Sequence, residues 1–416
     1  MEERTTTIPK NGKTESDALG IAVDIGTTTL FVALWDLRDG RLKAETACYN
    51  PQRKYGTDVI SRLFWAMKNE DGLNRMREAV LEGLNGCIEK VCRDSGTDPG
   101  NIRKAVAAGN TIMSHFYAGK DPEGLAEAPF MPAYEGPLSM NGAESGLGIN
   151  GEAEVLVVPN IAGHVGGDIT AGILDSGIAD SGETALFIDI GTNGEIVVLS
   201  EGTGVACSTA AGPAFEGAGI SCGMRAETGA VKSMEIHDGR IRFDVIGGGT
   251  PEGLCGSGLI DALAVITEAG FTDETGRITD SEGLERAFEE KVRLTQLDIR
   301  NLQLAKGAVA AGIQICLREM IIKAADIDKL VIGGAFGSYI DPESAIAIGL
   351  IPEIDRKKII IAGNTSAAGA AKILLGQETG IKADKIPERV RHIELAGRED
   401  FQKVYLENMD LKKMAV

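Results

Sequence analysis

The sequence has no cysteine motif, no long apolar run and no apolar leader, and each absence excludes a class of protein. Its seven cysteines form no Cys-x-x-Cys pair, which argues against a disulfide framework, a zinc site or an iron-sulfur cluster in this chain. No run approaches the roughly 18 to 20 apolar residues that cross a bilayer. The polar start over residues 1–17 lacks the core of a signal peptide. We therefore predict a cytoplasmic protein with reduced, mostly buried thiols.

Positive charge is also scarce, which narrows the choice of partners. Lys and Arg number 42 against 61 Asp and Glu, leaving a net charge of -19. Such a surface repels phosphate backbones and anionic lipid, so we expect neither nucleic acid nor a membrane as partner. The hydrophobic fraction of 43% and the charged fraction of 25% are typical of a globular protein, and 416 residues allow more than one domain.

One segment of the chain occurs twice. Residues 20–36 read as a strand, a Gly-Thr turn and a second strand, and residues 185–199 repeat this pattern. Asp24-Ile-Gly-Thr27 thereby matches Asp189-Ile-Gly-Thr192. We predict a flexible tail over 1–18, a first lobe over 19–180 and a second lobe over 181–416, whose C-terminal segment could pack back on the first.

Strands and helices alternate through both predicted lobes. Apolar spacing predicts helices over 57–69, 73–93, 258–269 and 298–324, and strands over 104–108, 154–158, 330–332 and 359–362. A further helix should begin near Thr111, capped by Gly109-Asn110-Thr111, and residues 118–152 should form a looser connection. The fold class predicted is α/β, with two pseudo-symmetric lobes around a ligand-binding cleft.

Each Asp-Ile-Gly-Thr segment suits phosphate binding. A carboxylate ends a buried strand, and the following residues offer amide and hydroxyl donors to an anion, namely Gly26, Thr27, Thr28, Gly191, Thr192 and Asn193. Because a carboxylate beside phosphate repels it, Asp24 and Asp189 imply Mg²⁺, held largely through water. A turn that only reverses the chain is the alternative, but two matching copies favour the phosphate interpretation.

A third glycine cluster lies near the C-terminus, at residues 330–339. It follows a predicted strand and has little bulk to block a flat ligand, so we expect it to bind a nucleoside through Gly333, Gly334, Phe336 and Ser338. It is a weak match to a Rossmann fingerprint, which would follow the first strand of its domain.

Two acidic residues are candidates to orient an attacking water during phosphoryl transfer. Asp168 stands where a helix should begin, and it could equally be a helix N-cap. Glu195 follows the second aspartate segment, and the alternative is a strand residue that faces solvent. Asn193 can donate to phosphate or tolerate a left-handed turn.

Three further residues are weaker candidates for cofactor binding. Lys306 could stack near an adenine or ribose, although a lone lysine on a helix more often faces solvent. Gly256 and Ser257 precede a helix whose N-terminal amides would favour a phosphate or ribose oxygen, and a plain helix start explains them nearly as well.

The three glycine-bearing segments, in this order, resemble those of the ASKHA ATPases, which include acetate and sugar kinases, heat-shock cognate chaperones and actin. Four other motifs resemble the ATPase portion of the reductive activators of corrinoid enzymes. They are Asn50-Pro-Gln-Arg-Lys-Tyr-Gly-Thr-Asp-Val-Ile-Ser-Arg62, Ala211-Gly-Pro-Ala-Phe-Glu-Gly-Ala-Gly-Ile-Ser-Cys-Gly-Met-Arg-Ala226, Gly253-Leu-Cys-Gly-Ser-Gly-Leu-Ile-Asp261 and Gln303-Leu-Ala-Lys-Gly-Ala308. The similarity spans roughly residues 20 to 410.

That resemblance implies actin-like, ribonuclease H-like lobes and an ATPase that uses Mg-ATP. It implies that ATP-driven lobe closure helps to return Co(II) corrinoid to Co(I) on a methyltransferase corrinoid protein. Asp24, Asp189, Asp168 and Glu195 would be its catalytic residues. Many relatives carry an N-terminal two-iron two-sulfur domain, but no cysteine cluster precedes Gly20, so a separate low-potential donor is expected. The dispersed histidines place the corrinoid on the partner, and the family suggests a homodimer.

Two other functions share the phosphate segments. A small-molecule kinase of the acetate or sugar type would need a substrate pocket and a base, for which Asp168 is the best candidate. An actin-like or chaperone-like module would bind nucleotide mainly to assemble or clamp.

Overall fold

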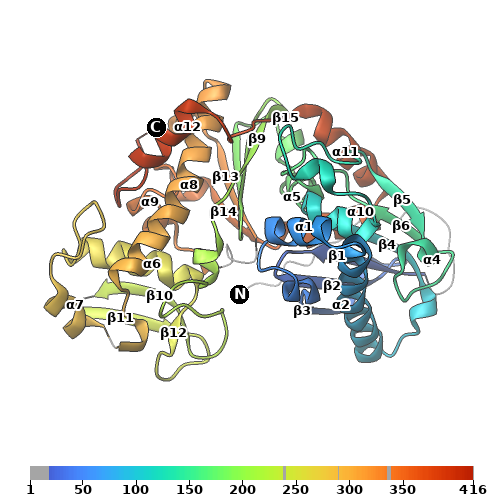
Figure 1. Cartoon of the computed structure of the whole chain (residues 1–416), viewed down its shortest axis with the longest axis horizontal. Helices are drawn as coiled ribbons and strands as arrows, with labels where there is room; N and C mark the ends of the chain where they lie inside the picture. The colour runs from blue at the N-terminus through green and yellow to red at the C-terminus, as the bar shows by residue number, and fades with distance from the viewer. Residues whose placement is uncertain (1–17, 238–239, 289, 335–338, 416) are drawn as a thin grey trace. The chain divides into compact units, whose positions relative to one another are not determined.

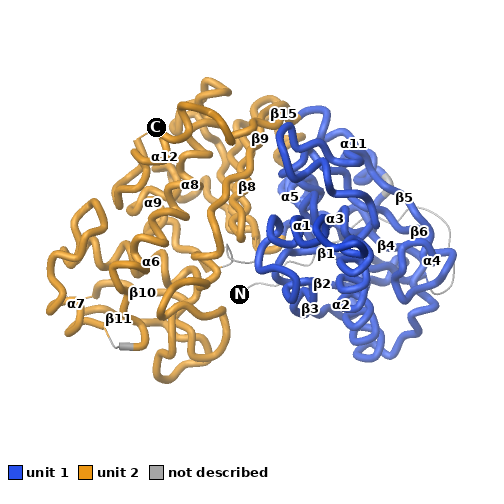
Figure 2. The backbone as a smooth tube through the Cα atoms, in the orientation of Figure 1, with its two compact units in different colours: residues 1–177, 365–389 blue, residues 178–364, 390–416 orange. Residues whose placement is uncertain are grey.

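The computed structural model describes residues 18–237, 240–288, 290–334 and 339–415 (Figure 1). The chain forms two compact units (Figure 2). Unit 1 consists of residues 1–177 and 365–389, and unit 2 of residues 178–364 and 390–416. Residues 365–389, which we predicted to lie in the second lobe, thus belong to unit 1. Unit 1 is therefore built from two separate segments of the chain.

Unit 1 is built on a six-stranded sheet with the order β3-β2-β1-β4-β6-β5. Its strands are β1 (Leu19–Ile25), β2 (Thr29–Asp36), β3 (Arg41–Tyr49), β4 (Ile102–Gly109), β5 (Leu138–Asn141) and β6 (Glu154–Val157). The first three form an antiparallel meander, β4 and β6 run parallel to β1, and β5 is antiparallel to β6. The predicted strand-turn-strand at the start of the chain is confirmed.

Helices cover both faces of this sheet, because β1 is apolar on both. Ile21 and Val23 join the core beneath α1 (Val59–Lys68), α2 (Gly72–Ser95) and α3 (Thr111–Ala118). Ala22 joins the core beneath α5 (Gly167–Ser176), α10 (Thr365–Leu375) and α11 (Gln377–Arg389). Helices α5 and α10 pack closely, since a Cβ on Gly369 would lie 2.1 Å from the Ala171 carbonyl oxygen. The short α4 (Gly142–Ser145) lies in the connection before β6.

Unit 2 holds a second six-stranded sheet and a smaller one. The larger has the order β14-β13-β7-β8-β9-β15, and the smaller the order β11-β10-β12. The larger sheet comprises β7 (Ala185–Ile190), β8 (Gly194–Ser200), β9 (Thr203–Thr209), β13 (Lys329–Gly333), β14 (Ile359–Gly363) and β15 (Val390–His392). The smaller comprises β10 (Ala230–His237), β11 (Arg240–Val245) and β12 (Gly253–Leu254).

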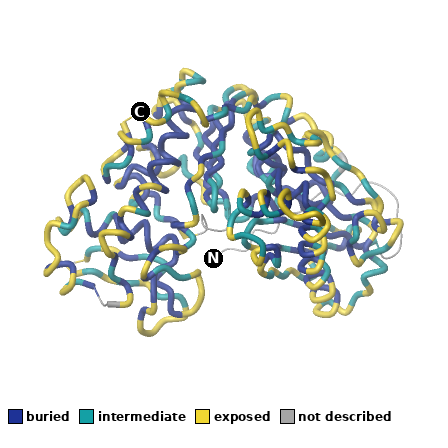
Figure 3. The backbone as a smooth tube through the Cα atoms, viewed as in Figure 1, coloured by how far each residue is buried: buried dark blue, intermediate teal, exposed yellow. Residues whose placement is uncertain are grey.

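One large core joins the sheets of unit 2 to its helices (Figure 3). These are α6 (Gly256–Glu268), α7 (Ser281–Ala287), α8 (Gln296–Met320), α9 (Pro342–Ala347) and α12 (Glu399–Glu407). Helix α8 packs on β8 and β9. It ends at Met320 rather than at residue 324, because Ile321 takes a left-handed φ of 57° and closes the helix onto the Leu317 and Arg318 carbonyls.

The two large sheets share one topology, which confirms the predicted duplication. The order β3-β2-β1-β4-β6 of unit 1 corresponds to β9-β8-β7-β13-β14 of unit 2, with an antiparallel meander followed by two parallel strands in each. Six of the seven cysteines are buried and Cys48 is half-buried, which confirms that the thiols are mostly buried. Within the described residues, no helix combines the length and apolarity that crossing a bilayer requires.

Candidate functional site

The first aspartate segment is a tight turn between β1 and β2. Asp24 is the second-last residue of β1 and is half-buried. A Cβ on Gly26 would lie 2.4 Å from the Thr29 carbonyl oxygen, so only glycine fits this turn. The Ser366 hydroxyl donates to Asp24 Oδ1 at 2.8 Å. A carboxylate, a close backbone turn and a hydroxyl thus meet at one strand end.

Ser366 reaches Asp24 from the first turn of α10, whose N-terminus lies at this strand end. The neighbouring Thr365 is fully buried, and its hydroxyl has no hydrogen-bond partner. The free amides of a helix N-terminus attract anions, so α10 adds positive potential beside the Asp24 turn. No local sequence motif marks Ser366, so its contact with Asp24 was not predicted.

Two asparagines fix the backbone and hydroxyl of the same turn. Asn50 donates from Nδ2 to the Gly26 carbonyl and from its backbone N–H to the Thr28 carbonyl, each at 2.9 Å. Asn110 donates its Nδ2 to Thr27 Oγ1 at 3.0 Å and caps α3 by accepting from the Met113 amide. The predicted cap at residues 109–111 is confirmed, and it also orients Thr27.

The second aspartate segment joins β7 to β8. Asp189 stands directly opposite Glu195 in antiparallel register, so the two carboxylates share one face of the sheet. Glu195 is only 8% exposed and accepts from the Ser208 hydroxyl at 3.1 Å. Its alternative interpretation as a solvent-facing strand residue is therefore wrong. Because like charges directly opposite repel, this pair favours a bound cation.

The turn after Asp189 is closed by its own backbone and by Glu216. The Gly191 amide donates to the Asn193 carbonyl at 2.9 Å, and Thr192 donates its hydroxyl to Glu216 Oε1. Among the described non-glycine residues, positive φ occurs at Phe130, Glu201 and Ile321. Asn193 therefore adopts no left-handed conformation, and that alternative for it is wrong.

The third glycine cluster begins against the second aspartate. Strand β13 lies parallel to β7, with Gly333 in register with Asp189. Gly334 has a φ of +86°, and a Cβ there would lie 2.6 Å from Asp189 Oδ1 and 2.9 Å from the Ile190 carbonyl oxygen. No sequence motif indicates this close approach. Phe336 and Ser338, the other nucleoside-binding candidates, lie outside the described residues.

Asp168 lies in the first turn of α5 but does not cap it. The N-cap is Gly166, and Asp168 Oδ1 accepts from the next backbone amide, that of Ile169, at 2.9 Å. The alternative interpretation of Asp168 as an N-cap is therefore wrong. Its role in orienting water stays a prediction.

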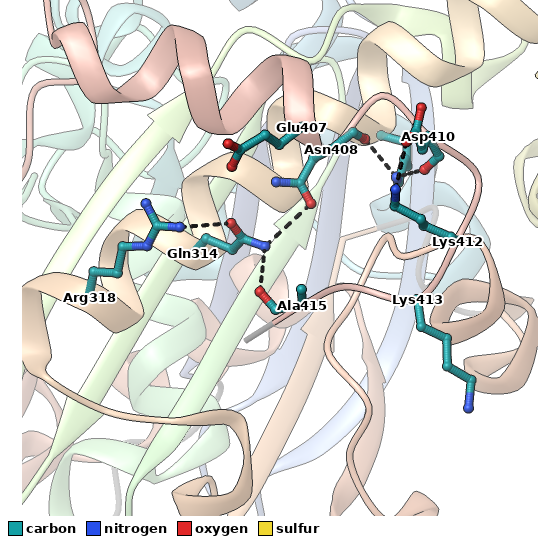
Figure 4. A pocket seen from close by; sticks show the side chains of 9 residues that line it. Gln314, Arg318, Glu407, Asn408, Asp410, Lys412, Lys413 and Ala415 are labelled. Carbon is teal, nitrogen blue, oxygen red and sulfur yellow. Dashed lines mark hydrogen bonds and ion pairs between the residues drawn. The ribbon is translucent and has the colours of Figure 1, made fainter. Parts of the chain in front are cut away.

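Lys306 does not face solvent, which was the alternative to a nucleotide-binding role. Its side chain is 1% exposed, and Nζ donates to the carbonyls of Asn408 and Asp410, both at 2.6 Å. Burial lowers the pKa of Lys306 to about 8, opposed by the nearby Asp410 charge. A pocket of about 210 Å³ adjoins it, lined in part by Gln314 and Arg318 (Figure 4). Lys306 thus anchors the C-terminal segment to α8.

The start of α6 is explained by packing. Ser257 is buried and donates its hydroxyl to the Lys232 carbonyl at 2.6 Å. A Cβ on Gly258 would lie 2.2 Å from the Val231 carbonyl oxygen. These contacts stabilise the start of α6. They support a plain helix start at Gly256 and Ser257, which was the alternative to cofactor binding.

The acidic residues fit Mg²⁺ bound mainly through phosphate and water. Among the described residues, no group of three or more Asp, Glu, His or Cys side chains could enclose a metal ion. Mg²⁺ commonly uses one or two carboxylates together with substrate phosphates and waters, and Asp24 in unit 1 and Asp189 in unit 2 each offer one such carboxylate. The second position brings two acidic residues together, because Asp189 and Glu195 are paired in register on adjacent strands.

Two family models match the chain. One, described as the C-terminal domain of RACo, the ASKHA domain, matches residues 183–416. The other, described as the RACo middle region, matches residues 19–181. Their boundary falls within a few residues of the one between the two units at Gly177 and Ile178.

Known proteins are similar over nearly the whole chain. The corrinoid activation enzyme RamQ of Eubacterium limosum is 35% identical, over 96% of this chain and 71% of its own. The [Co(II) methylated amine-specific corrinoid protein] reductase of Methanosarcina barkeri is 26% identical, over 93% of this chain and 76% of the length of that protein. A solved reductive activator for corrinoid, iron-sulfur protein is 36% identical with a TM-score of 0.88, over 98% of this chain and 68% of its own.

Proposed function

This chain belongs to the family defined by the RACo middle region and ASKHA domain, and from that premise we propose that it is an ATP-dependent activator of a corrinoid protein. In this role it promotes the reduction of Co(II) corrinoid to Co(I) on a partner of a methyltransferase system. The observation that carries the proposal is the duplicated strand end, where Asp24 and Asp189 occupy equivalent positions in two sheets of the same topology.

Asp24 and Asp189 are proposed to hold Mg-ATP through its metal and its phosphates. When bound, Mg²⁺ would neutralise charge on the phosphate oxygens. Ser366 fixes the Asp24 carboxylate, and the α10 N-terminus offers amides to an anion. Thr27 and Thr28, and Gly191, Thr192 and Asn193 in the second copy, are the proposed phosphate contacts, and Gly333 and Gly334 begin the proposed nucleoside segment.

Glu195 and Asp168 are proposed to act on water during hydrolysis. Glu195 is buried beside Asp189 and held by Ser208, so its carboxylate has a fixed direction. Asp168 stands at the start of α5, and its Oδ1 accepts a hydrogen bond from the Ile169 amide. A carboxylate that orients a water in line with the terminal phosphate needs such positioning more than it needs a shifted pKa.

ATP can drive activation only if nucleotide and partner each prefer one conformation of this protein. A ligand that binds two conformations equally shifts neither. We therefore propose that nucleotide-driven closure changes the affinity for the corrinoid protein. Electrons come from a separate low-potential donor in this scheme, because the seven cysteines are dispersed and mostly buried. A homodimer and a cytoplasmic location remain part of the proposal.

The visible spectrum of a corrinoid protein provides the test. The full chain is mixed with a Co(II) corrinoid protein, a low-potential reductant and Mg-ATP, and the expected result is an ATP-dependent rise of Co(I) absorbance. Asp24→Asn and Asp189→Asn should each abolish that rise while the chain remains folded. No dependence on ATP in the wild type, or full activity in both variants, would contradict the proposal. Release of free phosphate rather than a phosphorylated product distinguishes it from a kinase.

A further inference from the structure

Helix α1 carries apolar side chains on two arcs, and the protein covers only one of them. Val59, Leu63 and Ala66 are buried against the core of unit 1. Ile60, Phe64 and Met67, which share the adjacent arc because they are four and three residues apart, are 40%, 42% and 42% exposed. A helix packed on one side needs a single apolar stripe, so the second arc calls for another explanation.

Basic residues are frequent in the segment that contains this exposed arc. Residues 49–68 contain four Lys and Arg against one Asp, in a chain whose net charge is -19. Three of the four are exposed, namely Arg53, Lys54 and Lys68. Each of these cations lies over an aromatic ring, those of Tyr49, Tyr55 and Phe64 respectively. The segment is therefore a local basic and aromatic surface on an acidic protein.

A contact between two aromatic rings joins the segment before α1 to α1 itself. Tyr55 follows the short 3-10 helix at Pro51–Lys54, and its ring lies 4.1 Å from that of Trp65 on α1. The buried Arg62 donates from Nε to the Gly56 carbonyl at 2.9 Å, which fixes the connection before α1. We call the exposed side chains of Arg53, Lys54, Ile60, Phe64, Met67 and Lys68 the docking face.

The docking face is attached directly to the first aspartate segment. Asn50 starts the 3-10 helix that carries Arg53 and Lys54, and it holds the Gly26 and Thr28 carbonyls through two hydrogen bonds of 2.9 Å. A second connection runs through Met113 on α3, whose sulfur contacts both Asn50 Nδ2 and Arg62 Nη1. Asn50 and Met113 therefore connect the Gly26–Thr28 turn directly to the residues that support the docking face.

We propose that the docking face binds the corrinoid protein, through an acidic surface of that partner with an apolar centre. This inference rests on the proposed function and names where that function meets its partner. A second copy of this chain is a poorer occupant, because a symmetric contact would set the same basic side chains against one another. The connection through Asn50 makes this face suited to report the state of the nucleotide turn.

Binding to a Co(II) corrinoid protein that the wild-type chain activates provides the test. Phe64→Glu puts a carboxylate in the centre of the docking face, and the double variant Lys54→Glu/Lys68→Glu reverses its charge. We expect each to raise the Kd for the corrinoid protein at least tenfold. Mg-ATP affinity and thermal unfolding should stay unchanged. Binding of the wild type should weaken with salt, and the charge-reversed variant should lose most of that dependence.

Matched controls separate this face from a general effect of surface charge. Ile381→Glu alters an exposed apolar residue of the same unit, and Leu406→Glu one of the other unit, with exposed fractions of 58% and 68%. Both should bind the corrinoid protein like the wild type.

Each other outcome overturns the inference. Wild-type affinity in Phe64→Glu refutes the docking face while leaving the proposed function intact. A change in oligomeric state by ultracentrifugation, with unchanged corrinoid protein binding, assigns the face to a second copy instead. If the wild type itself neither binds nor activates a corrinoid protein, the proposed function fails, and the docking assignment fails with it.

Discussion

Ser366 donates a hydrogen bond to Asp24 across 2.8 Å, although 342 positions separate the two residues in the sequence. The serine stands in the first turn of α10, which packs on β1 and on α5. A helix from the end of the chain therefore orients the carboxylate that begins the first aspartate segment.

Removal of this hydroxyl should impair catalysis without unfolding the protein. Ser366→Ala deprives the Asp24 carboxylate of a donor, and hydrogen bonds to charged groups contribute about 1.5 to 3 kcal/mol. If about 1 to 2 kcal/mol of this is expressed in the transition state, kcat for ATP hydrolysis falls roughly 5- to 30-fold. Ser176→Ala, which removes a serine hydroxyl bonded to the Gly172 carbonyl in the same unit, should keep kcat unchanged. Equal rates in both variants would exclude a positioning role.

Removing one of the opposed carboxylates of Asp189 and Glu195 should have opposite effects on stability and on Mg²⁺ affinity. Glu195→Gln removes one of two like charges, so the free energy of unfolding without Mg²⁺ should rise by about 0.2 to 1 kcal/mol. The Mg²⁺ concentration needed for half-maximal ATP binding should increase several-fold, because the cation loses part of its attraction. Urea unfolding and a Mg²⁺ titration measure the two effects. The exposed Glu201→Gln should change neither, and a less stable Glu195→Gln would contradict the repulsion.

A side chain at residue 334 should disturb the second aspartate. In Gly334→Ala, the φ of +86° costs about 1 to 2 kcal/mol, and the new Cβ also meets the Asp189 carboxylate and the Ile190 carbonyl. We expect a total loss above about 2 kcal/mol in urea unfolding and weaker Mg-ATP binding by calorimetry. Gly397→Ala is the control, because its φ is +81° with nothing within 4 Å of a Cβ. A loss no larger than in that control would show that the contact is harmless.

Lys306 should give stability a pH dependence in the alkaline range. Its folded pKa of about 8 lies below the ordinary value of 10.5, because burial disfavours the ammonium. Between these values the unfolded chain binds more protons than the folded one, so the free energy of unfolding rises with pH. Relative to Lys306→Met, the wild type should gain roughly 1 to 2 kcal/mol between pH 8 and 9.5. Urea unfolding of both proteins at several pH values measures it, and a constant difference would refute the shifted pKa.

The sequence revealed those parts of the fold and site that local pattern determines. The Asp24 and Asp189 hairpins are short apolar strands around a Gly-Thr turn, and their repetition is visible without any knowledge of packing. Asn110 was recognised as a cap, because an asparagine after a strand and before a helix satisfies free amides.

Contacts made by distant segments had no such local signal. Ser366 and Gly334 matter through neighbours that only tertiary packing supplies. Glu195 was assigned an exposed alternative, although the apolar run that follows it indicates a strand buried on both faces. Lys306 likewise stands among small apolar residues on α8, and this setting was the available sign of its burial.

The return of residues 365–389 to unit 1 has a consequence for biosynthesis. The apolar side of β1 and β4 that α10 covers stays exposed until residues 178–364 of unit 2 have been translated. This apolar surface of the nascent chain is uncovered while unit 2 is being translated. A premature stop before Thr365 leaves unit 1 without α10 and α11. Fragments cut at a single point between the units should therefore aggregate, whereas co-expression of residues 365–389 with the N-terminal half should restore its solubility.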